Sequence, residues 1–194
     1  MIEKFRENFH ERKPESVGEV KKFDPEREKK YRQEIRKTLT GRLSDALKDF
    51  GFKKMGHSLW SRKVRDSWHI VYLQRSQFSH QYYVEAGICK KKDIPKGEKP
   101  VIVFCKERKR IEGIVESIEK ERTQREENAE EVIRQKVNDI KVALDFELPG
   151  AQKEYPGEYF IPSVSPEESE NKIGEIQKAV GEYVPLWFDA KSST

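Results

Sequence analysis

Residues 68–73 read WHIVYL, a run of aromatic and β-branched side chains without Asp, Glu, Lys or Arg. This composition is typical of a β-strand. Because apolar residues occupy both alternating faces, we expect a strand over 67–75 at the centre of a sheet, with a helix covering at least one side. The polar turn Arg65-Asp66 precedes it, and residues 57–64 are predicted as its neighbouring strand.

Two further strands are predicted downstream. Residues 82–89 (YYVEAGIC) form the third, and residues 101–105 (VIVFC) form the fourth, after a basic loop over 90–100. Short strands in series with polar connections favour an antiparallel meander.

Helices are predicted on both sides of this strand series. Apolar residues recur every three or four positions between Tyr31 and Phe50, which predicts a helix over 26–50 that ends in a left-handed cap at Gly51. A C-terminal helix is predicted over 166–182. A longer charged helical element is expected over about 112–146, packed at one edge or projecting.

The predicted fold class is therefore α+β. A roughly four-stranded, mainly antiparallel sheet is packed by the N-terminal and C-terminal helices in a single domain over residues 26–188. Residues 1–25 are expected to be a flexible charged arm, and residues 189–194 a tail.

The charged residues are distributed unevenly. They make up 38% of the chain, yet the net charge is only +4. Residues 51–110 carry 15 Lys and Arg against 5 Asp and Glu, whereas residues 111–194 carry 10 against 19. A basic surface attracts nucleic acid or an acidic partner protein. The alternative is that the two segments face each other or are simply solvated.

The remaining composition points to the cytoplasm and away from membranes. No stretch approaches the roughly 20 apolar residues of a membrane span, and the N-terminal sequence MIEKFR is polar. The two cysteines, Cys89 and Cys105, are expected to be free thiols in a reducing compartment.

Five short segments, taken together, resemble a known family. They are residues 47–54 (LKDFGFKK), Trp60, residues 73–76 (LQRS), residues 86–88 (AGI) and residues 183–187 (YVPLW). This order is similar to that of the bacterial domain-of-unknown-function family 4304, which has a helix, a glycine-phenylalanine-lysine turn and a strand that ends in a glutamine-lysine-serine-like triplet.

The resemblance would cover about residues 26–188. It departs from the family at Arg75, where lysine is usual, and in the long charged region 112–146. It implies a small α+β cytoplasmic domain and no established activity, so it assigns no catalytic residue and no cofactor.

Four polar residues at the end of the central strand form a candidate ligand site. Arg75 is a candidate to bind a carboxylate or phosphate in fork geometry, with polar neighbours at a strand end and its loop. Alternatively, the neighbours satisfy backbone groups and Arg75 pairs with a carboxylate. The candidate residues are Gln74, Arg75, Ser76 and His80.

Aromatic and basic residues of the strands form a candidate surface for single-stranded nucleic acid. Aromatic rings can stack bases while cations contact phosphates. The alternative is that Trp60, Trp68, Tyr72 and Tyr82 are core residues beneath the first helix. The candidate residues are Trp60, Arg62, Lys63, Tyr82 and Tyr83.

Catalytic and metal-binding motifs are weak in this sequence. His69, His80, Cys89 and Cys105 lack the spacing of a zinc site, so no metal and no cofactor are predicted.

A Ser-His-Asp group could combine Ser76 or Ser79 with His80 and Asp66, but such a combination is unspecific. An enzyme of unknown type therefore ranks as the second alternative.

The function predicted from sequence is non-catalytic binding of a protein partner, of an immunity or regulatory type. In the immunity version, the acidic C-terminal helices would mimic nucleic acid against a basic nuclease. Binding of single-stranded nucleic acid through the basic aromatic sheet is the first alternative.

Overall fold

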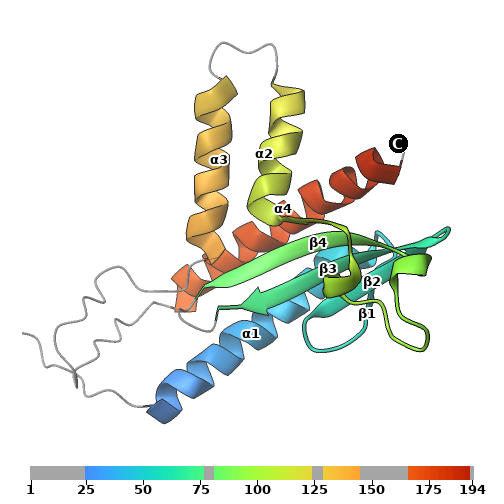
Figure 1. Cartoon of the computed structure of the whole chain (residues 1–194). Coiled ribbons are helices and arrows are strands. Elements are labelled where there is room, and N and C mark those ends of the chain that lie inside the picture. The colour runs from blue at the N-terminus through green and yellow to red at the C-terminus, as the bar shows by residue number, and fades with distance from the viewer. Residues whose placement is uncertain (1–24, 77–80, 124–128, 145–165, 193–194) are drawn as a thin grey trace, which may run out of the picture.

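The computed structural model describes residues 25–76, 81–123, 129–144 and 166–192. In this part of the chain, four α-helices accompany a five-stranded antiparallel sheet of order β1-β2-β3-β4-β5 (Figure 1). The predicted α+β class is confirmed, with one strand more than expected. The predicted arm, apart from Pro25, lies outside the described residues.

In chain order the elements are α1 (Pro25–Lys48), β1 (Lys53–Lys54), β2 (Leu59–Val64), β3 (Ser67–Arg75), β4 (Tyr82–Lys90), the short 3₁₀ helices η1 (Lys91–Asp93) and η2 (Ile102–Phe104), β5 (Glu107–Arg110), α2 (Ile111–Arg122), α3 (Ala129–Leu144) and α4 (Pro166–Ser192).

Strand β3 lies at the centre of the sheet, between β2 and β4. Its Ile70 and Val71 are fully buried and point to opposite faces of the sheet. Val71 joins the main core with α1 and α4, and Ile70 joins a second, smaller core. The run of apolar residues on both faces therefore predicted the position of this strand correctly.

The predicted C-cap of α1 is confirmed. Gly51 has a φ of 77°, in the left-handed region. The Gly51 amide donates to the Lys48 carbonyl at 3.0 Å and the Phe52 amide donates to the Leu47 carbonyl at 3.3 Å, which is a Schellman motif. The motif folds Phe52 back beneath the helix, where it is buried.

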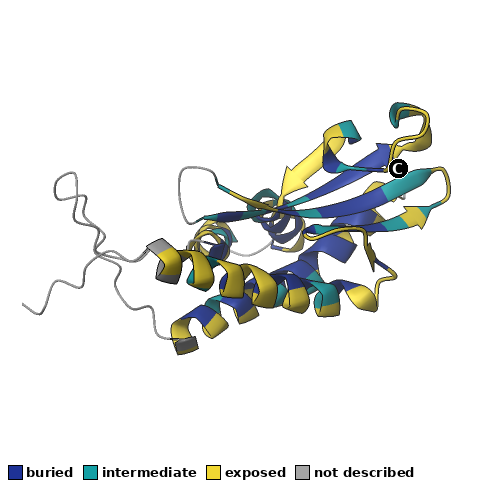
Figure 2. Cartoon of the chain, turned by 90° about the horizontal axis from the view of Figure 1, so that it is seen from below, coloured by how far each residue is buried: buried dark blue, intermediate teal, exposed yellow. Residues whose placement is uncertain are grey.

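Helices α1 and α4 cover one face of the sheet, and their buried sides face each other and the strands (Figure 2). Helix α4 continues to Ser192, past the end predicted at residue 182. Pro185 usually ends a helix, but Val184 and Phe188 around it are fully buried against the rest of the fold. Tertiary packing therefore retains the last turns of α4.

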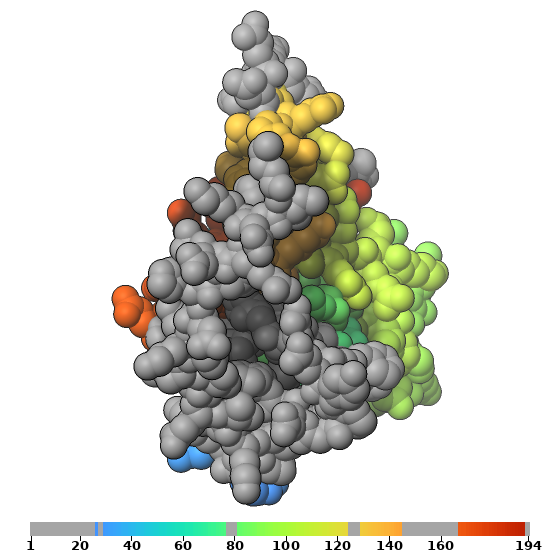
Figure 3. Space-filling view, turned by 90° about the vertical axis from the view of Figure 1, so that its left-hand side faces the viewer, coloured from blue at the N-terminus to red at the C-terminus, as the bar shows by residue number. Residues whose placement is uncertain are grey.

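The charged region predicted as one element over 112–146 forms two helices, α2 and α3, which stand side by side above the sheet (Figures 1 and 3). Both also contact α4. Their apolar residues, which form narrow stripes in the sequence, are buried against each other, α4 and the sheet: Ile111, Ile114, Val115, Ile118, Ile133, Ile140 and Leu144.

A buried carboxylate joins these three helices. Glu119 of α2 is 2% exposed, and it accepts hydrogen bonds from Lys136 Nζ of α3 at 2.7 Å and Tyr183 Oη of α4 at 2.8 Å. Burial by itself raises the pKa of Glu119, but the hydrogen bonds from Lys136 and Tyr183 outweigh burial and hold the pKa below its ordinary value. Glu119 is therefore an ionised carboxylate that links the three helices through hydrogen bonds.

The second face of the sheet is partly covered by residues 91–106, which we call the cap loop. The predicted strand over 101–105 is wrong, because residues 102–104 form η2 and the next strand is β5. A short apolar run is ambiguous in sequence. Here the segment does not pair with a neighbouring strand; instead, its Ile102 side chain packs onto the face of the sheet.

The prediction of free thiols is also wrong. Cys89 of β4 and Cys105 of the cap loop form a disulfide across a sequence separation of 16 residues. This spacing carries no signal in sequence. The return of the cap loop over β4 brings the two Cα atoms within 4.1 Å.

None of the helices in the described ranges is long and apolar enough to cross a membrane.

A substitution at Gly87 tests whether the cap loop packs directly on β4. A Cβ at this position would lie 2.7 Å from Ile102 Cδ1 and 2.9 Å from Cys105 Cβ. We expect Gly87→Ala to lower the free energy of unfolding by about 1–3 kcal/mol, because the loop must shift. Urea denaturation followed by circular dichroism measures this change.

Gly41→Ala on α1 is the matched control, since no atom beyond its own stretch of helix lies within 4 Å of its Cβ position. Alanine there is expected to stabilise the helix by up to about 1 kcal/mol. A Gly87→Ala variant as stable as the wild-type protein would contradict this direct packing.

Candidate binding surface

One end of the sheet collects cations from the end of β2 and the turn after it, from the end of β4 and from η1. Ser67, after the β2–β3 turn, pairs with Lys90 at the end of β4. The Lys91 amide donates to the Asp66 carbonyl at 2.9 Å, which ties the turn to η1. We call the exposed cations gathered here the basic end: Lys63, Arg65, Lys90, Lys91 and Lys92.

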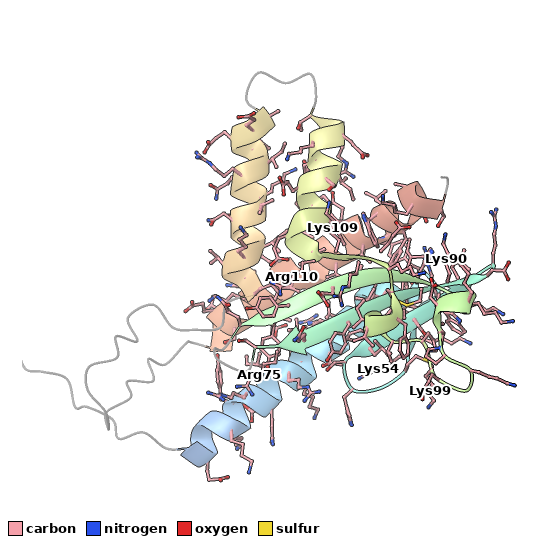
Figure 4. The ribbon with its side chains drawn as sticks, in the orientation of Figure 1. Lys54, Arg75, Lys90, Lys99, Lys109 and Arg110 are labelled. Carbon is pink, nitrogen blue, oxygen red and sulfur yellow. A yellow bond between two sulfur atoms is a disulfide. The ribbon has the colours of Figure 1, made fainter. Side chains whose placement is uncertain are left out.

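Other cations extend this surface. Figure 4 shows Lys90 and Lys99 at this end of the molecule, Lys54 nearer the middle of the sheet and Arg75 at the opposite end. Lys54 lies on β1 and Lys99 on the cap loop, and both are exposed.

The positive charge of this segment is scarcely neutralised within the fold. Of the 15 cations in residues 51–110, only Arg62 and Lys106 form an ion pair with another described residue. Like charges that remain unpaired on one surface raise the local potential and attract anionic partners.

The acidic segment is different, because many of its carboxylates are already paired. The described parts of residues 111–194 carry 13 Asp and Glu and 8 Lys and Arg. Seven of these acids have ion-pair partners: Glu116, Glu119, Glu131, Glu168, Glu170, Glu182 and Asp189.

Two ion pairs between described residues link the basic and acidic segments. Arg62 pairs with Asp189 at 3.5 Å, and Lys191 pairs with Glu107 at 3.9 Å. The acidic helices therefore do not neutralise the basic end.

Arg62, a candidate for nucleic-acid contact, is engaged inside the protein. Its Nε donates to His69 Nδ1 at 3.2 Å and one of its terminal nitrogens donates to the Phe50 carbonyl at 3.0 Å. Its guanidinium also lies over the rings of Phe52 and Phe188. These contacts indicate that Arg62 stabilises the fold.

His69 lies beneath Arg62, 2% exposed and stacked on Phe188 with 4.2 Å between ring centroids. Burial, followed by the charge of Arg62, lowers the pKa of His69 to about 4. Since Nδ1 accepts from Arg62, Nε2 carries the proton, and it lies 3.5 Å from Ser192 Oγ. A ring in this tautomer cannot take a proton from Ser192 through Nε2.

The candidate aromatic platform is divided between the core and the surface. Trp60 and Tyr82 are buried in the main core, and Trp60 Nε1 donates to Ser44 Oγ at 2.9 Å. They cannot stack a base in this fold. Lys63 is exposed, and half-buried Tyr83 lies under the guanidinium of Arg110 at 4.2 Å.

The core interpretation therefore fits Trp60 and Tyr82. Trp68 and Tyr72 lie on the opposite face of the sheet, packed against the smaller core.

The candidate ligand residues lie at the opposite end of the sheet from the basic end. Gln74 and Arg75 are exposed, and the Ser76 amide donates to the Gln81 carbonyl at 2.9 Å. His80 lies outside the described residues. Among the residues that the structure describes, Arg75 has no ion-pair partner.

Arg32 and Arg36 of α1 and Arg75 of β3 all lie near the Tyr82 hydroxyl, and the sequence did not point to the two arginines of α1. Arg36 donates to Ser58 Oγ at 3.1 Å, and Arg32 lies one turn earlier on the helix. Burial, followed by the charge of Arg75, lowers the pKa of Arg32. Their spacing on one helix was the available signal, but nothing in sequence placed that helix beside Arg75.

Among the described residues considered for zinc and for a Ser-His-Asp group, only Cys89 and Cys105 are brought together, in the disulfide, while Ser79 and His80 lie outside the described ranges. His69 points toward α4, whereas Cys89 lies on the opposite face in a disulfide. Asp66 and Ser76 lie at opposite ends of β3.

A groove of about 580 Å³ separates parts of α2 and α3. Charges of both signs line it, and its Glu116 and Lys120 form an ion pair at 2.6 Å. This mixed lining selects neither an anion nor a cation.

The chain matches one family model, described as Domain of unknown function (DUF4304), over residues 43–146. This match confirms the resemblance, but it is shorter than the expected 26–188 and extends through α3, within the region that we expected to depart from the family. No curated protein and no solved structure matches the chain.

The burial of His69 predicts a pH dependence of stability. The folded ring titrates near pH 4 and the unfolded ring near pH 6.5. Its stability contribution is therefore complete above pH 6.5 and lost as the pH falls toward 4, by up to about 1.4 kcal/mol per pH unit. We expect His69→Gln to flatten the free energy of unfolding in this window, measured by urea denaturation at several pH values. An unchanged slope would contradict the neutral buried ring.

Arg75 is expected to be unimportant for folding. Because it is exposed and lies near Arg32, Arg75→Ala should change the free energy of unfolding by less than about 0.5 kcal/mol. Arg62→Ala, which removes several contacts, is the comparison and should lose about 1–3 kcal/mol. Thermal denaturation compares the two. A comparable loss in Arg75→Ala would instead support a structural role for Arg75.

Proposed function

The chain belongs to the DUF4304 family, and we propose that it is a non-catalytic binding module that docks an acidic partner protein through the basic end of its sheet. The supporting observation is the contrast in charge pairing. The cations of residues 51–110 are exposed and largely without ion-pair partners in the described structure, whereas many acids of the later helices are paired.

A protein partner accounts better for this surface than single-stranded nucleic acid. Trp60 and Tyr82 are buried, so two of the rings needed for base stacking are withheld. Exposed apolar side chains accompany the lysines of β1, since Phe50 and Met55 flank that strand. Apolar contacts among charges suit a protein surface better than a phosphate backbone.

An immunity or regulatory role is part of this proposal. The version in which the acidic helices mimic nucleic acid is less well supported, because Glu119 and Glu182 are engaged within the helices themselves. A bacterial cytoplasm is the proposed setting, as the family resemblance implies. The Cys89–Cys105 disulfide is the one feature of the described structure that a reducing cytoplasm does not favour.

Charge reversal tests the proposed surface. The full chain is used as bait in extracts of its host, as the wild-type protein and as the triple variant Lys90→Glu, Lys91→Glu, Lys92→Glu. We expect the wild-type protein to retain a specific partner at low salt and the variant to lose it at least tenfold, because electrostatic attraction becomes repulsion. Quantitative mass spectrometry measures the retained partner.

The matched control reverses three exposed lysines elsewhere: Lys30→Glu, Lys37→Glu and Lys178→Glu. Partner retention by this control supports the basic end, and equal loss in both variants would overturn the assignment. Loss after nuclease treatment would instead favour nucleic acid. Recovery of the native protein outside the cytosolic fraction would contradict the compartment.

A further inference from the structure

The cap loop is held on the sheet by a covalent bond and by close packing. The Cys89–Cys105 disulfide joins its end to β4, and Ile102 packs above Gly87, where no side chain intervenes. An ion pair between Lys106 and Asp93 at 2.6 Å connects its two ends. These contacts fix the loop in one position.

The core beneath the cap loop is small. It consists of four buried residues with half-buried neighbours around them; the buried ones are Ile70, Cys89, Ile102 and Cys105. So little apolar burial offsets only part of the entropy lost when a loop of this length is ordered. The disulfide therefore contributes strongly to the rigidity of the loop.

The loop presents an exposed apolar side chain at its outer surface. Val103 of η2 is 68% exposed, more than any other exposed large hydrophobic residue in the described ranges. Its neighbours Ile102 and Cys105 point inward and are buried. Because Ile102 and Cys105 face the sheet, Val103 between them faces solvent and is accessible to a partner.

Exposed lysines flank Val103 along the sequence of the loop. Lys96 and Lys99 precede it, Lys106 follows it, and Lys91 and Lys92 begin the loop as members of the basic end. All five are exposed, and only Lys106 has an ion-pair partner within the described part of the chain. An apolar centre with a charged rim is the arrangement of a protein contact site.

We propose that the cap loop is the docking element of this domain, with Val103 entering an apolar depression on the partner while the partner's carboxylates face the surrounding lysines. The inference rests on the proposed function and deepens it, because it specifies an acidic surface with an apolar centre. The disulfide holds this element ready to bind, so that little entropy is lost on docking.

Two synthetic peptides provide defined probes for the full chain. One is a glutamate peptide with a central leucine-phenylalanine pair, and the other carries two serines at its centre. We expect the wild-type protein to bind the apolar-centred peptide about tenfold more tightly at low salt, as one buried apolar contact allows. Fluorescence anisotropy measures both dissociation constants.

Val103→Asp should abolish this preference, while Val142→Asp on α3 should retain it. Val142 is 53% exposed and far from the cap loop in sequence, so it is a matched control. The added negative charge weakens the binding of both peptides alike. The ratio of the two dissociation constants therefore reports the apolar contact alone. Equal binding of both peptides to the wild-type protein, or a preference that survives Val103→Asp, would overturn the inference.

The double variant Cys89→Ser, Cys105→Ser tests the role of the disulfide. We expect the folded variant to bind the apolar-centred peptide about tenfold more weakly, because the loop must be ordered on binding. Unchanged affinity would contradict the role of the disulfide in docking.

The outcomes separate the two proposals. Binding of both glutamate peptides without a preference overturns the cap loop and leaves the basic end intact. Binding of neither peptide by the wild-type protein at low salt contradicts both proposals.

Discussion

The burial of α4 beneath the sheet is the constraint on which the rest of the structure depends. Phe188 is fully buried, stacked on His69 of β3 and within 5.7 Å of the Phe52 ring that follows α1. Earlier in the same helix, Tyr183 donates to Glu119 and so attaches α2. One helix thus organises the sheet, α1 and the α2–α3 pair around a common core.

This arrangement explains why the basic segment is exposed. Since α1 and α4 occupy one face of the sheet and the cap loop seals part of the other, the charged residues of the segment are left to strand ends, turns and the edge strand β5. Charged edge strands also resist pairing with other chains. That explanation suffices for β5 but not for the lysines of η1 and the cap loop, which lie outside the sheet.

Features set by local sequence were predictable, whereas features that depend on contacts between distant segments were not. The position of β3, the helix over α1 and the Gly51 cap were predictable, because each follows from a local pattern of apolar residues or from a single glycine. The conformation of residues 101–105 (VIVFC) was not predictable, because a short apolar run fits a strand and a packed loop equally well. Candidate residues such as Trp60 and Arg62 lie on strands as expected. Trp60 is buried in the core and Arg62 makes contacts within the fold, so neither is available to a ligand.

The sequence alone determined the α+β class, the central strand, the cap at Gly51 and the imbalance of charge between residues 51–110 and 111–194, since all are properties of composition and local periodicity. Only the tertiary structure decided that Cys89 and Cys105 are bonded, that Glu119 is buried and that the basic end is not neutralised by the acidic helices. These features depend on distances between atoms far apart in the chain, which packing sets and local sequence does not encode.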